Sequence, residues 1–188
     1  KIILFTIICF ACIIILLFLK NKTDDFSDTS IGTNFKLLTQ DNKYLSLSQL
    51  PEKYSLVFFG FTRCPSVCPF TMEVISQIIK ELPNYTATKV NPVLITLDPV
   101  HDTPKVLKAY INKYNKNFIA FTGSEKEIMD VEKSFKVYSY KISESSDKEM
   151  ILDHSSFIYL VNKYGQYITH FSPNENTEKI LQNLSSQL

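Results

Sequence analysis

Short apolar runs that alternate with amphipathic segments are the feature that most restricts the fold of this chain. The apolar runs have the length of buried strands, and between them apolar residues recur at the spacing of one helix face. Strands that alternate with helices in this way form a largely parallel sheet covered on both faces. The sequence therefore predicts an α/β domain with strands at 55–61, 93–97, 118–121 and 157–161.

Helices are predicted between these runs and after the last one. Ser124 and Glu127 have the spacing of a capping box at the start of one helix. Residues 162–167 are predicted as the turn of an antiparallel hairpin that adds a strand at 167–171. The apolar residues that define the predicted helix faces are Met72, Ile75, Ile79 and Leu82; Val106, Leu107, Tyr110, Ile111 and Tyr114; Ile128, Val131 and Phe135; and Ile180, Leu181, Leu184 and Leu188.

The N-terminal segment is predicted to lie outside this domain. Residues 2–19 carry no charge and are flanked by lysines, which is close to the shortest transmembrane helix, and no signal-peptide cleavage site is visible. We expect a retained transmembrane anchor over residues 1–20, a polar linker over 21–33 and a globular domain over 34–188. Cys9 and Cys12 fall inside the anchor and are expected to have no redox or metal role.

The charge balance argues against one large class of partner. The formal net charge is +1, and basic residues do not cluster with aromatic ones, so we expect no nucleic-acid binding. Almost all basic residues are lysines; Arg63, the single arginine, is adjacent to Cys64.

The segment GFTRCPSVCPF, residues 60–70, places two cysteines between a buried strand and a helix. This is the carboxyl end of the sheet, where open α/β folds bind ligands. Pro69 is expected to start the helix and Cys68 to cap it, so that the helix dipole and Arg63 both favour thiolates. Thiolates serve a redox dithiol as well as a metal site, and a buried structural pair is a third reading. The cysteines alone leave the chemistry open.

Three histidines are the candidates for a further metal ligand. His154 comes just before a buried strand, where it could be an imidazole ligand or a structural residue. His101 lies in the loop DPVHDTP and is read as an exposed side chain. His170 alternates with apolar residues in YITHF and is read as a strand residue that faces solvent or a partner.

Three motifs, FFGFTRCPSVCP, LITLDPVHDTP and LDHSSFIYLV, have an order and spacing that closely resemble the Sco proteins, the thioredoxin-like copper chaperones of cytochrome c oxidase assembly. The resemblance covers residues 34–188. It implies a thioredoxin-like three-layer sandwich with a mixed central sheet, preceded by the transmembrane helix. It also implies a mononuclear copper site with Cys64 and Cys68 as thiolate ligands and His154 as the imidazole ligand.

The same resemblance implies a location and partners. The domain would be tethered in a bacterial periplasm or a mitochondrial intermembrane space. There it would deliver copper to the binuclear site of cytochrome c oxidase subunit II, with other copper chaperones as further candidate partners.

Residues around the site also match the family. Asp98 fits the family's D-P-x-R-D pattern. Asp98 and Arg63 are the candidates for residues that surround the metal ligands without binding the metal. Alternatively, Asp98 closes its loop or caps a helix. Asp102 or Thr103 is expected to cap the helix that follows. His101 stands where the family often has arginine, which makes it a candidate for a second nearby imidazole.

Two other functions compete with copper binding. A thiol–disulfide reductase that keeps the oxidase's copper-ligand cysteines reduced needs a reversible Cys64–Cys68 disulfide but not His154. A peroxiredoxin-like peroxidase fits less well, because FFGFTRC lacks the proline of such sites. Soft thiolates select copper(I) and an added imidazole admits copper(II), whereas structural zinc sites use four protein ligands. We expect a copper metallochaperone, a binding protein more than an enzyme, with the reductase as the alternative.

Overall fold

The computed structural model describes residues 31–141, 152–154 and 156–188. The expected anchor over 1–20, most of the expected linker, and Cys9 and Cys12 therefore lie outside the described residues. Within the part of the chain that is described, no helix is long and apolar enough to cross a membrane.

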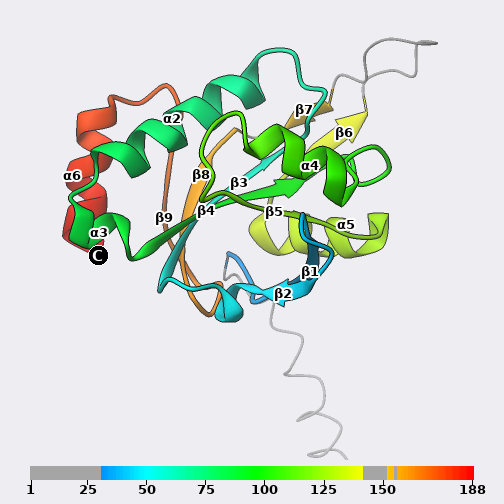
Figure 1. The fold of residues 1–188 in the computed structure, drawn as a ribbon, viewed down its shortest axis with the longest axis horizontal. Helices are drawn as coiled ribbons and strands as arrows, with labels where there is room; N and C mark the ends of the chain where they lie inside the picture. The colour runs from blue at the N-terminus through cyan, green and yellow to red at the C-terminus, as the bar shows by residue number, and fades with distance from the viewer. Residues whose placement is uncertain (1–30, 142–151, 155) are drawn as a thin grey trace, which may run out of the picture. The chain divides into compact units, whose positions relative to one another are not determined.

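A seven-stranded sheet forms the centre of the described domain (Figure 1). Its strands lie in the order β2-β1-β5-β4-β3-β8-β9. The remaining strands, β6 and β7, pair with each other in a separate two-stranded sheet. The strands are β1 (Lys36–Thr39), β2 (Tyr44–Ser46), β3 (Tyr54–Gly60), β4 (Val90–Thr96), β5 (Ile119–Thr122), β6 (Ser139–Lys141), β7 (Leu152–His154), β8 (Ile158–Asn162) and β9 (Tyr167–Phe171).

The central sheet is mixed, as the family resemblance implied, and the expectation of a largely parallel sheet was wrong. Parallel pairing is confined to β3 with β4 and β4 with β5. The other pairings, β1–β2, β1–β5, β3–β8 and β8–β9, are antiparallel. Helical crossovers between β3, β4 and β5 allow these central strands to run parallel. The hairpins β1–β2 and β8–β9 at the two edges of the sheet are antiparallel.

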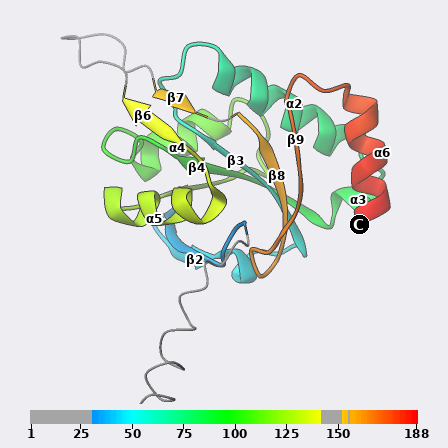
Figure 2. The same cartoon turned by 180° about the vertical axis from the view of Figure 1, so that it is seen from behind.

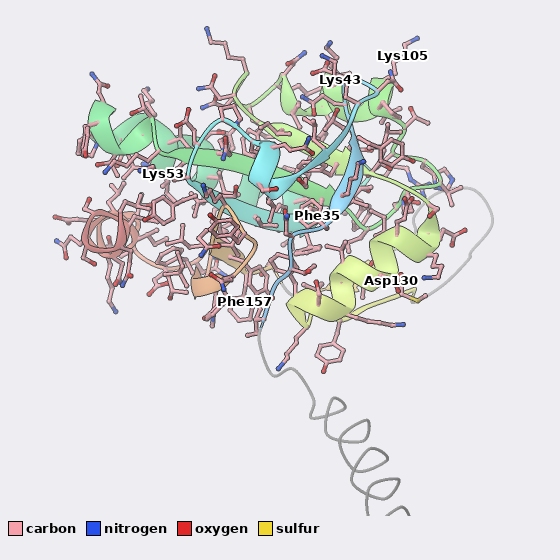
Figure 3. The ribbon with its side chains drawn as sticks, turned by 90° about the horizontal axis from the view of Figure 1, so that it is seen from below. Phe35, Lys43, Lys53, Lys105, Asp130 and Phe157 are labelled. Atoms are coloured by element: carbon pink, nitrogen blue, oxygen red, sulfur yellow. The ribbon has the colours of Figure 1, made fainter. Side chains whose placement is uncertain are left out.

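Helices cover both faces of this sheet. Figures 1 and 2 show α2 and α4 on one face and α5 on the other, and Figure 3 shows the sheet between α4 and α5. The C-terminal helix α6 packs against α2. The helices are α2 (Val67–Glu81), α3 (Asn84–Ala87), α4 (Pro104–Ile111), α5 (Glu125–Phe135) and α6 (Thr177–Gln187), with a 3₁₀ turn η2 (Leu47–Gln49).

The predicted helices are all present, with local differences. Ser124 forms the expected capping box with Glu127 at the start of α5. Thr103 caps α4 by accepting a hydrogen bond from the Val106 amide, so Thr103 and not Asp102 is the cap. Val106 was placed on the buried face of α4, but its side chain is exposed.

An aromatic cluster connects helix α5 to β3, the strand that precedes the cysteines. The ring of Phe135 in α5 lies 5.1 Å from that of Phe59 in β3 and 5.7 Å from that of Tyr159 in β8. Phe59 and Phe135 are fully buried. Aromatic pairs at this separation add about 1 kcal/mol each to the stability gained from burial. The cluster holds β3 rigidly behind the segment that follows it.

Candidate metal centre at Cys64 and Cys68

The two cysteines lie at the junction between β3 and α2 and differ in exposure. Cys64 is partly exposed, whereas Cys68 is fully buried in the first turn of α2. The helix begins at Val67, with Ser66 as its N-cap, so Cys68 is inside the helix rather than its cap. Pro69 is tolerated in this first turn because its missing N–H would have had no acceptor within the helix.

The first turn of α2 binds the sulfur of the more exposed cysteine. The backbone N–H of Cys68 donates a hydrogen bond to Sγ of Cys64 over 3.4 Å. The amino end of a helix suits a sulfur that carries negative charge, because its amides point outwards and the helix dipole is positive there. No disulfide joins the two sulfurs in this structure.

The pKa of the buried cysteine is shifted in the direction opposite to the one expected. The hydrogen bond with Cys64 and, next, burial raise the pKa of the Cys68 thiol well above its usual value. The expectation that helix dipole and Arg63 favour thiolate at both cysteines is therefore wrong for Cys68. The pair consists of one partly exposed cysteine and one buried cysteine whose thiol pKa is raised.

Gly60, the last residue of β3, makes room for the buried sulfur. A Cβ atom at this position would lie 3.0 Å from Sγ of Cys68 and 2.7 Å from the ring of Phe58. Real Cβ atoms rarely approach other atoms so closely, so a side chain here would force the sulfur or the ring to move. Glycine thus allows Cys68 to pack directly against the end of the strand.

Asp102 joins the segment before Cys64 to the neighbouring strand. Its buried carboxylate accepts hydrogen bonds from the Thr62 amide at 3.1 Å, the Thr62 hydroxyl at 2.5 Å and the Thr96 hydroxyl at 2.6 Å. Burial raises the pKa of Asp102, and the hydrogen bonds from Thr62 and Thr96 oppose that rise. Sequence analysis gave Asp102 a capping role and missed this one, because its partner Thr62 lies 40 residues earlier in the chain.

Asp98 contacts Arg63 and His101 at the edge of the site. The Arg63 guanidinium donates to Oδ2 of Asp98 from Nη2 at 2.8 Å and from Nε at 3.2 Å. Nδ1 of His101 lies 2.8 Å from Oδ1 of Asp98 and 2.9 Å from Nη2 of Arg63. Asp98 is 3% exposed, whereas Arg63 and His101 are about half exposed. Thr62 and Arg63, the two residues before Cys64, are therefore both bound by carboxylates of the 98–102 loop.

The structure locates the backbone of the third predicted ligand. His154 ends β7, opposite Ser139 of β6. In both Figure 1 and Figure 2, β7 lies beside the segment that leads into α2. Among the side chains that the structure describes, no group of three or more His, Cys, Asp or Glu residues is arranged to hold a metal ion. The roles of Cys64, Cys68 and His154 as ligands stay predictions.

His170 lies in a different environment. Its Nδ1 is 2.7 Å from the hydroxyl of Tyr167, and its ring packs edge-on against Phe157 at 4.7 Å. The side chain is exposed on β9, as the alternating pattern of this strand predicted.

Comparisons with known proteins agree with the three motifs. Residues 23–188 match the family model SCO1/SenC. A SCO2-like protein of Rickettsia prowazekii is 39% identical over 153 residues, which cover 81% of this chain and 74% of that protein.

Solved structures extend the match to three dimensions. The structure of Bradyrhizobium japonicum ScoI with copper bound has a TM-score of 0.75 at 32% identity, covering 85% of this chain and all of that one. BsSco, described as a member of the Sco family of cytochrome c oxidase assembly proteins with a disulfide switch, has a TM-score of 0.65 at 27% identity, covering 84% of this chain and 94% of that one. The thioredoxin-like fold with a mixed sheet is thereby confirmed, and the chain belongs to the SCO1/SenC family.

Proposed function

We propose that this protein is a membrane-tethered copper metallochaperone that binds one copper ion through Cys64, Cys68 and His154. Its cargo is destined for the binuclear copper site of cytochrome c oxidase subunit II. The anchor over residues 1–20 holds the domain in a periplasm or a mitochondrial intermembrane space. Family membership and the copper-bound relative support copper binding and a role in oxidase assembly.

The observation that carries the proposal is the arrangement of the two sulfurs. They lie on either side of the start of α2, with Cys64 reachable from solvent and Cys68 buried against Gly60. Thiolate sulfur is the donor that copper(I) prefers, so this pair fits the metal chemically. The loop before Cys64 is bound at Thr62 and Arg63, which limits its movement when a metal enters or leaves.

Copper titration of the full chain in detergent, with the thiols kept reduced, tests this function. We expect one copper per chain, and copper(II) should give a thiolate-to-metal charge-transfer band in the visible region. One zinc per chain without any such band on adding copper would refute the proposal.

Ligand variants separate the three donors. Cys64→Ser and Cys68→Ser should each abolish tight copper binding, because a hydroxyl is a poor ligand for a soft metal. His154→Ala should weaken copper(II) more than copper(I), since two thiolates alone can hold copper(I). His170→Ala is the matched control, because His170 contacts Tyr167 and Phe157 and is not part of the proposed site. Equal copper(II) spectra for the His154 and His170 variants would remove His154 from the ligand set.

A thiol–disulfide reductase is the second candidate, and the contrast between the two cysteines favours it. A reachable sulfur paired with a buried one is the arrangement in which the first attacks a partner disulfide and the second resolves the mixed disulfide. Oxidation of the thiols in the presence and absence of one equivalent of copper(I) discriminates between the two functions. Strong protection by copper supports the chaperone, whereas equal rates would favour the reductase.

A further inference from the structure

Charged residues are distributed unequally between the two ends of the central sheet. Tyr54, the first residue of β3, pairs with Val90 at the start of β4 and with Asn162 at the end of β8. The segments that enter β3 and β4 and the turn between β8 and β9 therefore meet at one end of the sheet, which we call the amino end. Cys64 follows the last residue of β3 and so lies at the opposite end.

The segments at the amino end are rich in lysine. Lys53 enters β3, Lys89 enters β4, Lys163 is in the β8–β9 turn, and Lys136 follows α5. Glu52 is the carboxylate that these segments contribute. Lys53 and Lys163 are exposed, whereas Lys89 is partly buried and its Nζ donates a hydrogen bond to the carbonyl of Leu188 over 2.9 Å. Lys53 is labelled in Figure 3, which views the domain from below.

The loops at the cysteine end lack this excess of lysine. Segments 61–66, 97–103 and 172–176 contain no lysine, and their one arginine, Arg63, is paired with the buried Asp98. The lysines of the amino end therefore have no counterpart in the loops around Cys64.

Exposed tyrosines accompany the lysines at the amino end. Tyr85 and Tyr164 are 75% and 58% exposed. Nζ of Lys89 lies 3.9 Å from the ring centre of Tyr85, and Nζ of Lys163 lies 5.0 Å from that of Tyr164. Tyrosine and lysine are the side chains that proteins place at the level of lipid headgroups.

The described chain also begins at this end. The Tyr167 amide donates to the carbonyl of Ile31, and the Gly32 amide donates to the carbonyl of Ser134. Gly165, in the same turn as Lys163, adopts a φ of +77°, and a Cβ there would overlap the backbone of Thr33. Residues 31–33 are thus packed tightly against the β8–β9 turn, and the segment that precedes Ile31 joins the domain beside Lys163.

We propose that the amino end, with the exposed Lys53, Lys136 and Lys163, faces the anionic phospholipid headgroups of the membrane. This inference rests on the membrane tether of the proposed function. A lysine close to an anionic bilayer is attracted to it, and the attraction is lost beyond a Debye length. The loops at the other end contain no lysine and lack this attraction. The bilayer therefore orients the domain, and Cys64 points away from the lipid towards partner proteins.

Lysine footprinting on the full chain in lipid nanodiscs tests this orientation. Discs of phosphatidylcholine are compared with discs that also contain phosphatidylglycerol, and acetylation by an N-hydroxysuccinimide ester is followed at each lysine by mass spectrometry. We expect Lys53 and Lys163 to be labelled several-fold more slowly on the anionic discs, with the difference lost at high salt. Lys105, exposed in the first turn of α4 at the cysteine end, is the internal control and should be unaffected.

Charge variants provide a second measurement on the same discs. The double variant Lys53→Gln, Lys163→Gln should abolish the protection of Lys136, whereas Lys105→Gln should preserve it. Equal labelling of Lys53 and Lys163 on both kinds of disc, or equal protection of Lys105, would overturn the inference. Copper titration of the same samples reports on the metal site independently, so failure of the orientation is distinguishable from failure of the proposed function.

Discussion

Asp102→Ala removes the side chain that binds the segment before Cys64 to β4. Asp102 accepts three hydrogen bonds from Thr62 and Thr96, and at a net contribution of about 1 kcal/mol each we expect a loss of roughly 3 kcal/mol in the free energy of unfolding. The Thr96 hydroxyl is buried and would lose its acceptor, which adds to the loss. Release of Thr62 should also make Cys64 react faster with iodoacetamide.

Urea unfolding followed by circular dichroism measures this loss, with Asp102→Asn as the matched variant. With its carbonyl at the position of Oδ2, asparagine can still accept from the Thr62 amide and the Thr96 hydroxyl, and its NH₂ can donate to the Thr62 hydroxyl, so we expect a loss of only about 1 kcal/mol. Asp130→Ala controls for the loss of an exposed carboxylate and should change stability little, because its pair with Lys126 is exposed to solvent. An Asp102→Ala variant as stable as Asp130→Ala would refute the reasoning.

The stability of the wild-type domain relative to Asp102→Asn should fall as the pH rises. Burial raises the pKa of Asp102, so the folded domain retains its proton at a pH where the unfolded chain has lost it. Protonated Asp102 contributes fully to the free energy of unfolding below the ordinary aspartate pKa of about 4. This contribution is lost as the pH rises through the raised pKa that Asp102 has in the folded domain. The wild-type domain should therefore lose stability relative to Asp102→Asn as pH rises above about 4. A constant difference between the two proteins would show that Asp102 does not titrate abnormally.

Three further substitutions probe the site and its support. Gly60→Ala should destabilise the domain by about 1–3 kcal/mol and speed alkylation of Cys68, because the new Cβ displaces the buried sulfur; urea unfolding and thiol mass spectrometry measure both. Ser124→Ala removes the capping box of α5 and should lower the free energy of unfolding by about 1 kcal/mol, with unchanged stability counting against the observed cap. Arg63→Gln removes the ion pair with Asp98 and the positive charge next to Cys64, so Cys64 should react more slowly with iodoacetamide; an unchanged rate would mean that Arg63 does not favour a thiolate at Cys64.

Much of the fold could be predicted because its main elements have strong local patterns. Strands β3 and β4 are buried along almost their whole length, and the continuous apolar runs at 55–61 and 93–97 reflect this burial. The β1–β2 hairpin escaped prediction because its strands are four and three residues long and have mixed burial. A short hairpin of this kind is stable only through its pairing with β5, which is a contact distant in sequence.

The chemical identity of the site was easier to predict than its geometry. The position of Cys64 and Cys68 between a strand and a helix followed from local pattern alone. The unequal burial of the two sulfurs did not, because it depends on Gly60 and on the packing of α2 against the sheet. The pairing of Arg63 with Asp98 was also not apparent, since the two residues are 35 positions apart.

The unequal exposure of the two cysteines gives the two candidate functions a common first step. Cys64 is the sulfur that solvent reaches, and the amide of Cys68 supports negative charge on it. Cys68 is buried, and its hydrogen bond with Cys64 together with burial raises the pKa of its thiol. An incoming copper ion and an incoming disulfide would both meet Cys64 first and Cys68 second. The two sulfurs therefore do not distinguish metal transfer from thiol exchange, and groups outside the cysteine pair must do so. His154 at the end of β7 is the predicted group, because only copper binding requires its imidazole.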